Sequence, residues 1–245
     1  WEMVGFLVGP ILSSVLFELG GITLPFFCLT AVLLAVVPFV LRVTIPGSEA
    51  PLEKPMRALL KRPAMQSCIA LGVAFYLAVG AFDALWALFI SDLGASQLYI
   101  GVTLSLFTLP MILVAPVAGR YASQHNLLRL LTKSLGLAVI MITSYAFIDS
   151  IWWICLPLVI HAIADAVSMP ATQLAVGKAS GETALAAGQG LFGAVGLIVA
   201  AVASLGGGYL YQTAGAAAVW ITVASAMIAC LAFAYWRGRG LLEST

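Results

Sequence analysis

Residues 75–91 read FYLAVGAFDALWALFIS, and this stretch decides the kind of fold that the chain can adopt. It is apolar almost throughout, yet it carries Asp83 in its interior. A carboxylate that faces the centre of a bilayer costs about 2.5–3.5 kcal/mol on insertion scales, so such residues usually face a protein interior or a wet cavity. We therefore expect Asp83 to belong to a functional site, or else to be a structural acid that hydrogen-bonds to a neighbouring helix.

The composition around this stretch is that of a membrane protein. The 245 residues are 62% hydrophobic and 9% charged, with a mean hydropathy of +1.10, whereas a soluble domain is about 45–50% apolar and about 25% charged. A net charge of +1 offers no basic patch for nucleic acid. The four cysteines fall in separate apolar runs without a CxxC pair, which predicts neither a disulfide framework nor a metal site.

Eight apolar runs reach, or nearly reach, the length of about 20 residues that a spanning helix needs. They are continuous and lack the alternation of a β-barrel, so they predict an all-α polytopic membrane protein. The runs are Met3–Leu19, Ile22–Leu41, Ser67–Ile90, Leu98–Val117, Leu127–Ile148, Ile151–Leu174, Gly188–Tyr211 and Ala216–Trp236. A longer linker, Thr44–Gln66, is rich in proline and basic residues and separates two runs from six.

The basic residues set the expected orientation. If the linker is cytoplasmic, all 11 Lys and Arg residues fall on the cytoplasmic side, as the positive-inside rule requires. We therefore expect a multi-pass protein of the cell (inner or plasma) membrane, in contact with the lipid bilayer, with a cytoplasmic C-terminus. The chain opens with Trp1 directly before an apolar run, and we interpret it as a fragment whose N-terminal part is missing.

Two short motifs accompany these runs. Residues 5–14, GFLVGPILSS, place Gly5, Gly9 and Pro10 in the first run, where a Gly-Pro pair bends a helix and leaves a smooth face for close packing. Residues 116–123, PVAGRYAS, place Gly119 and Arg120 after the fourth run, where we expect a loop that helps to close the cytoplasmic side. In the seventh run a row of small residues recurs every four positions, which favours close helix contact: Gly196, Ala200, Ser204 and Gly208.

This layout resembles a major facilitator superfamily transporter of the drug:proton antiporter type. Residues 5–14 are similar to the antiporter motif GxxxGPxxGG of helix 5, with serines in place of the last glycines, and residues 116–123 are similar to the motif between helices 8 and 9. The resemblance implies helices 5 to 12 of an MFS-type bundle of twelve. Residues 1–43 would end the N-terminal half, 44–66 would be the cytoplasmic linker, and 67–245 would form the six-helix C-terminal half.

Candidate site residues lie in the third, sixth and seventh runs. Asp83 lies about 10 Å from the outer end of its run, and Tyr76 and Trp86 project near the same face, which would suit an amphipathic or cationic ligand. His161 and Asp165 are four residues apart, so they share a helix face and can hold and pass a proton. His161 is expected near the midplane and Asp165 in the inner half; the alternative is a structural pair.

One further polar residue and the missing enzyme motifs complete the predictions. Gln189 either lines the cavity or hydrogen-bonds a neighbour. A glycine-rich phosphate loop, an HExxH motif and a GxSxG elbow are absent, so we expect no enzyme and no cofactor. We expect a secondary transporter, monomeric at full length, that exports small amphipathic molecules by alternating access with protons as the coupling ion. The alternatives are a proton symporter that imports a nutrient and a non-transporting membrane sensor.

Overall fold

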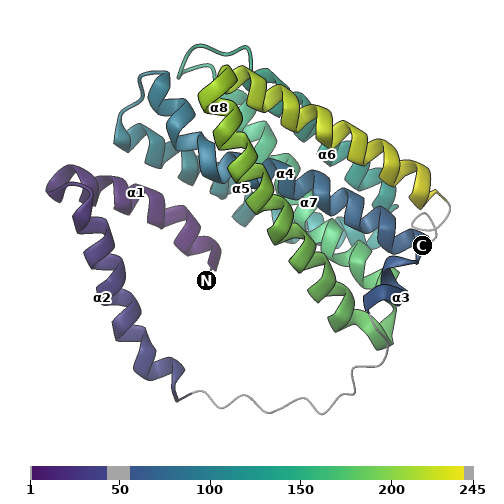
Figure 1. Ribbon diagram of the computed structural model, residues 1–245. Helices are drawn as coiled ribbons and strands as arrows, with labels where there is room; N and C mark the ends of the chain where they lie inside the picture. Colours follow the sequence, from purple (N-terminus) through teal and green to yellow (C-terminus); the bar gives the residue numbers. More distant parts are fainter. Residues whose placement is uncertain (1, 43–55, 240–245) are drawn as a thin grey trace.

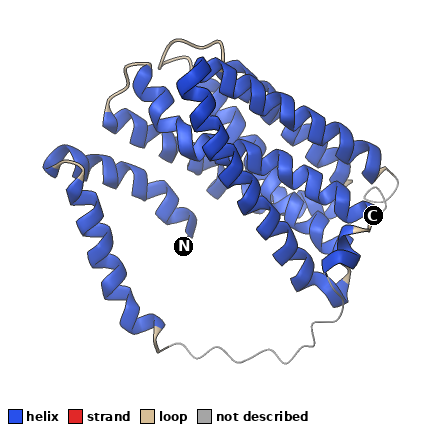
Figure 2. Cartoon of the chain, in the orientation of Figure 1, coloured by secondary structure: helices blue, strands red, loops and turns tan. Residues whose placement is uncertain are grey.

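The computed structural model describes residues 2–42 and 56–239, and its regular elements there are all helical (Figure 2). This confirms the predicted all-α membrane helix bundle. Six of the helices are long and apolar enough to cross a membrane, and the apolar part of α1 is shorter. The helices are α1 (Glu2–Gly20), α2 (Thr23–Val40), α3 (Met56–Leu60), α4 (Pro63–Asp92), α5 (Gln97–Gln124), α6 (Leu127–Tyr145), α7 (Cys155–Ser180), the 3-10 turn η1 (Glu182–Ala184) and α8 (Leu185–Gly238).

Helix α8 contains two of the predicted runs, because it bends sharply at Gly215. That residue has φ 83° and ψ 174°, a left-handed backbone conformation that glycine adopts without a Cβ clash. Figure 1 shows the chain reversing direction at this bend, after which the second part of α8 returns beside α6. The residues before and after the bend correspond to the predicted runs Gly188–Tyr211 and Ala216–Trp236, so all eight apolar runs form helices.

Several helices extend beyond the apolar runs. Helix α4 begins at Pro63, and α3 also lies within the predicted linker 44–66, so the described end of that segment is mostly helical; residues 43–55 lie outside the described residues. Helix α5 continues to Gln124, so the motif at 116–123 is helical and the expected loop there was wrong. Short capping sequences then begin the next helices: Ser96 accepts from the backbone N–H of Tyr99, and Asn126 accepts from that of Arg129.

The core is organised by the crossing of α4 and α8. At Gly80 a Cβ atom would lie 2.3 Å from the carbonyl oxygen of Ala200, so only glycine permits this approach. Ser204 Oγ donates to the Gly80 carbonyl oxygen at 2.8 Å. The predicted small-residue row therefore forms the contact as far as Ser204. At the end of the row, the residue that faces α4 is Gly207 and not the predicted Gly208. Three helical turns from Gly196 take about 11 residues and not 12.

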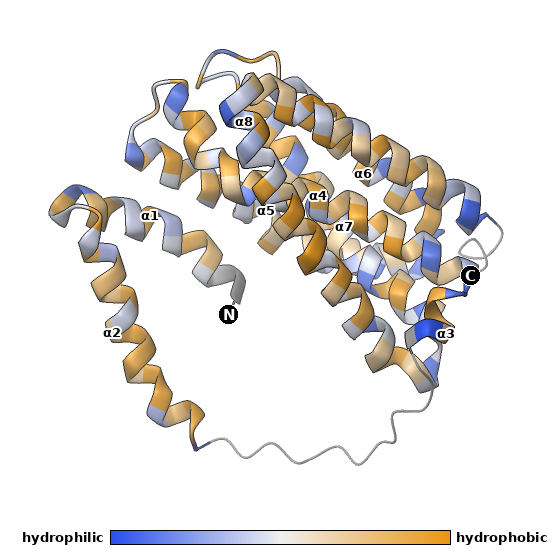
Figure 3. Ribbon diagram, viewed as in Figure 1, coloured by the Kyte–Doolittle hydropathy of each residue, from blue (hydrophilic) through white to orange (hydrophobic). Residues whose placement is uncertain are grey.

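Helices α1 and α2 form a hairpin beside this core, with α1 packed against α5 (Figure 1). The outward faces of both helices are apolar, as the hydropathy colouring shows (Figure 3). On α2, Phe27 and Leu34 are among the large apolar side chains that remain exposed. Such surface is what a bilayer covers, and it agrees with the membrane character that the composition predicts.

Candidate functional site

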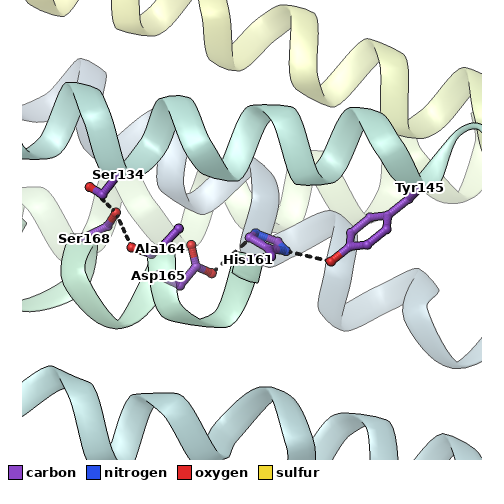
Figure 4. A network of polar contacts seen from close by, with 6 residues as sticks. All are labelled: Ser134, Tyr145, His161, Ala164, Asp165 and Ser168. Carbon is purple, nitrogen blue, oxygen red and sulfur yellow. Dashed lines mark hydrogen bonds and ion pairs between the residues drawn. The ribbon is translucent and has the colours of Figure 1, made fainter. Parts of the chain in front are cut away.

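A line of buried polar groups runs between α6 and α7 (Figure 4). The Tyr145 hydroxyl at the end of α6 lies 3.1 Å from His161 Nδ1, and His161 Nε2 lies 3.7 Å from Asp165 Oδ2. All three side chains are buried. His161 and Asp165 share a face of α7 because they are four residues apart, as their spacing predicted.

Two polar atoms in this line have no hydrogen-bond partner among the described residues: His161 Nε2 and Asp165 Oδ1. The distance of 3.7 Å between Nε2 and Oδ2 is too long for a direct hydrogen bond. Buried polar groups are rarely left unpaired, and those that are often have a functional role or an unseen water or ion. The pair is therefore poised to take up a proton, a water molecule or a polar ligand group.

Aromatic rings surround the histidine. The rings of Phe82 on α4 and Phe107 on α5 pack edge-on against the His161 ring, at centroid distances of 6.0 and 5.3 Å. Tyr145 packs edge-on against Trp86 and Trp220 at 5.3 and 5.4 Å. These rings remove the polar line from bulk water, and a low local dielectric strengthens each electrostatic interaction inside.

A second set of hydroxyls fixes the next turns of α7 against α6. Ser168 Oγ donates to Ser134 Oγ at 2.9 Å, or to the Ala164 carbonyl at 2.8 Å (Figure 4). Both serines are buried. Interhelical hydroxyl bonds of this kind help to hold membrane helices at one rotation, so these two serines orient the face that carries Asp165.

Helix α7 begins four residues later and ends six residues later than the predicted run. Asp165 consequently lies about 15 Å from the Cys155 end and about 22 Å from the Ser180 end. It lies in the half of the helix nearer Cys155, and its depth in the membrane stays a prediction. The hydropathy pattern marks the apolar part of a helix, whereas this helix begins after a turn and continues into polar residues.

The predicted cluster on α4 is divided by the structure. Asp83 is exposed. Trp86 is fully buried, where its indole N–H donates to Thr103 Oγ1 at 3.0 Å. Tyr76 is half-buried and packs against Gly196. The structure therefore does not bring these three residues together on one exposed face: Asp83 and Trp86 lie only about 60° apart around α4, but the boundary between its exposed and buried surface falls between them.

The remaining candidates have structural partners. Of the two alternatives for Gln189, the structure shows the hydrogen bond to a neighbour: its side chain donates to the Gln173 carbonyl on α7 at 3.0 Å. Arg120 is exposed within α5. Gly119 lies where α5 passes α7, but a Cβ there would make only an ordinary contact of 3.6 Å with Pro170 Cβ, so the packing does not require glycine.

The Gly-Pro motif on α1 contacts α5, but not through its glycines. A Cβ at Gly5 or Gly9 would have no atom within 4 Å, so the expected smooth face was wrong for the described residues. The close approach is made by Gly101 on α5, where a Cβ would lie 2.7 Å from the Pro10 carbonyl oxygen. The sequence did not mark Gly101, because an isolated glycine in an apolar run has no distinguishing pattern.

Hydroxyls of α5 compensate for Pro10. Proline lacks an N–H, so the carbonyl four residues earlier, that of Phe6, loses its helical partner. Thr108 Oγ1 donates either to this carbonyl at 3.4 Å or to the Leu104 carbonyl of its own helix at 3.2 Å, and Ser105 Oγ donates to the Leu7 carbonyl at 2.6 Å. A proline in a spanning helix is tolerated when a neighbour satisfies the freed groups in this way.

Comparison with known proteins then decides the family. The family model described as Major Facilitator Superfamily matches residues 69–243. The chain belongs to the major facilitator superfamily. A search of curated proteins gives no match. As a superfamily member with long apolar helices, the chain is a multi-pass membrane protein of a transporter family, in which enzymes are not typical.

Proposed function

We propose that the protein is a proton-coupled exporter of small amphipathic molecules that works by alternating access. The observation that carries this proposal is the buried line from Tyr145 through His161 to Asp165, with two polar atoms left unpartnered. Ionisable groups within spanning helices mark proton or substrate pathways in many transporters. Asp83, which is exposed on α4, would connect the buried pair to an aqueous cavity.

The arrangement of halves follows from the same proposal. Residues 1–43 would close the N-terminal half of a twelve-helix transporter, 44–66 would link the halves, and 67–245 would form the C-terminal half. In secondary transporters of this kind the halves rock about a site near the bilayer midplane. The α1–α5 contact at Pro10 and Gly101 would then lie between the halves, which supports a role for the Gly-Pro motif in this motion. The C-terminus would be cytoplasmic and the full-length protein monomeric.

Transport by the full-length protein in liposomes tests the proposal. A trapped pH-sensitive dye reports proton movement, and ethidium serves as the amphipathic cation. We expect an imposed pH gradient to drive ethidium transport, and Asp165→Asn and Asp83→Asn each to abolish it while the protein remains in the membrane. The matched control is Asp149→Asn, an exposed acid outside the helices, which should transport as the unchanged protein does. Normal gradient-driven transport by both site variants would contradict the proton role.

The direction of transport separates export from import. A His–Asp pair serves a symporter equally well, so the pair by itself does not favour export. The Gly-Pro motif favours export through its resemblance to the antiporter motif. Everted vesicles that accumulate the probe when their interior is acidic would support an exporter, whereas uptake in the opposite orientation would indicate a symporter. A full-length protein without any substrate-dependent proton flux would instead be a sensor.

A further inference from the structure

The hydroxyl of Tyr145 has only one hydrogen-bond partner among the described residues, His161 Nδ1 at 3.1 Å. Its side chain is 1% exposed, so the hydroxyl is shielded from bulk water. A phenol has one hydrogen to donate, and a neutral imidazole has one nitrogen that donates and one that accepts. Two arrangements are therefore possible: Tyr145 donates to Nδ1, or Nδ1 carries the hydrogen and donates to Tyr145.

Hydrogen-bond accounting distinguishes the two arrangements. If Nδ1 carried the hydrogen, the phenol hydrogen would be buried with no acceptor, and Nε2 would be a second acceptor facing the acceptor oxygens of Asp165. If Tyr145 donates, Nδ1 is satisfied and Nε2 carries the hydrogen 3.7 Å from Asp165 Oδ2. With Tyr145 as the donor, the Nε2 hydrogen lies toward Asp165, although 3.7 Å is too long for a full hydrogen bond. The opposite tautomer leaves the phenol hydrogen without any acceptor among the described residues, and such buried unsatisfied groups are costly.

We propose that Tyr145 is a positioning residue that holds neutral His161 in the Nε2–H tautomer, with that hydrogen directed at Asp165. The phenol is itself held in place: Trp86 and Trp220 pack edge-on against its ring, and Trp86 is fixed by its hydrogen bond to Thr103. A partner on one ring nitrogen commonly decides which proton state the other nitrogen presents.

The tautomer matters for transport only if the proposed function holds, and this part of the inference rests on it. An Nε2–H group donates toward Asp165 and so favours its ionised form, ready to receive a proton. The opposite tautomer would place two acceptors against each other and disfavour the ionised form. Tyr145 would therefore control which of the two buried groups holds the proton, without contacting substrate.

Nitrogen NMR on protein labelled with [15N]histidine tests the tautomer directly, without substrate or a pH gradient. The signals that disappear in a His161→Gln variant are those of His161. We expect Nε2 to give the signal of a protonated ring nitrogen and Nδ1 that of an unprotonated, hydrogen-bonded one. In Tyr145→Phe we expect the Nδ1 signal to lose its hydrogen-bond shift and the two tautomers to mix.

The control is Tyr99→Phe, which removes a hydroxyl that is hydrogen-bonded to the Ile151 carbonyl, just before the start of α7, the helix that carries His161. It should leave both His161 signals unchanged. A protonated Nδ1 in the unchanged protein would overturn the proposal, even if Tyr145→Phe failed to fold. Unaltered His161 signals in a folded Tyr145→Phe protein would overturn it as well. Because the spectra are independent of transport, an inactive protein with the expected tautomer would refute the proposed function alone.

Discussion

Replacing Gly80 by alanine should destabilise the protein through one defined clash. The added Cβ would lie 2.3 Å from the Ala200 carbonyl oxygen and 2.6 Å from Ala200 Cα. Ordinary contact begins at 3.4 Å, so α4 and α8 must separate by about 1.1 Å at this crossing. The obstructing atoms are backbone, so a change of side-chain rotamer cannot relieve the clash.

The expected loss is about 2 kcal/mol. Overpacking of a close contact costs about 1–3 kcal/mol, and the hydrogen bond from Ser204 to the Gly80 carbonyl, worth about 0.6 kcal/mol in a membrane protein, is strained or lost. The higher helix propensity of alanine offsets about 1 kcal/mol of this cost. For a chain of this size, about 2 kcal/mol corresponds to a decrease in Tm of about 4–8 °C.

Thermal unfolding of the purified protein in detergent measures this shift. Gly193→Ala on α8 is the matched control, because a Cβ there has no atom within 4 Å, and its Tm should stay unchanged or rise slightly. Combining Gly80→Ala with Ala200→Gly should not restore stability, since the clash is with backbone atoms. An unchanged Tm for Gly80→Ala, or full rescue by Ala200→Gly, would refute the described crossing.

Four further substitutions probe three polar contacts between helices, each by the same unfolding measurement. Ser105→Ala should cost about 0.5–1.5 kcal/mol, because it removes a hydrogen bond to a carbonyl next to Pro10; no loss would show that the bent helix satisfies itself. Arg62→Gln should cost about 1 kcal/mol, because its guanidinium donates to two carbonyls at the C-terminal end of α7, while lysine there should retain part of the effect. Trp86→Phe and Thr103→Val should each destabilise by about 1 kcal/mol, and the double variant by clearly less than their sum, since both remove one hydrogen bond; full additivity would argue against that bond.

The helices were predictable from hydropathy, but their ends were not. Each apolar run forms a helix because a spanning backbone must satisfy its own hydrogen bonds. The polar residues Arg120 and Gln124 continue α5, since a helix that has already formed extends at little cost into any sequence without a breaker. The bend at Gly215 coincides with the short connection expected at residues 212–215, because a left-handed backbone conformation there favours glycine.

The candidate site was predictable only where one helix carries all of it. The spacing of His161 and Asp165 places them on one face whatever surrounds them. Their partner Tyr145 lies on another helix, and its contact depends on the rotation and approach of α6 and α7, which no local pattern encodes. The grouping of Asp83 with Trp86 depends in the same way on the rotation of α4: the two residues lie only about 60° apart around the helix, and here the boundary between its exposed and buried surface falls between them.

Helix α4 connects the stability of the fold to the candidate site, because its faces have different tasks. One face crosses α8 at Gly80, another presents Phe82 to His161, and a third leaves Asp83 exposed. Phe82 and Asp83 follow Gly80 within one helical turn, so a shift of about 1.1 Å at the crossing must move both relative to α7. Gly80→Ala should therefore impair gradient-driven transport even at temperatures where the protein remains folded, whereas Gly193→Ala should not. Normal transport by folded Gly80→Ala protein would mean that the position of α4 is not critical to the site, and the acids would then have to act without close placement.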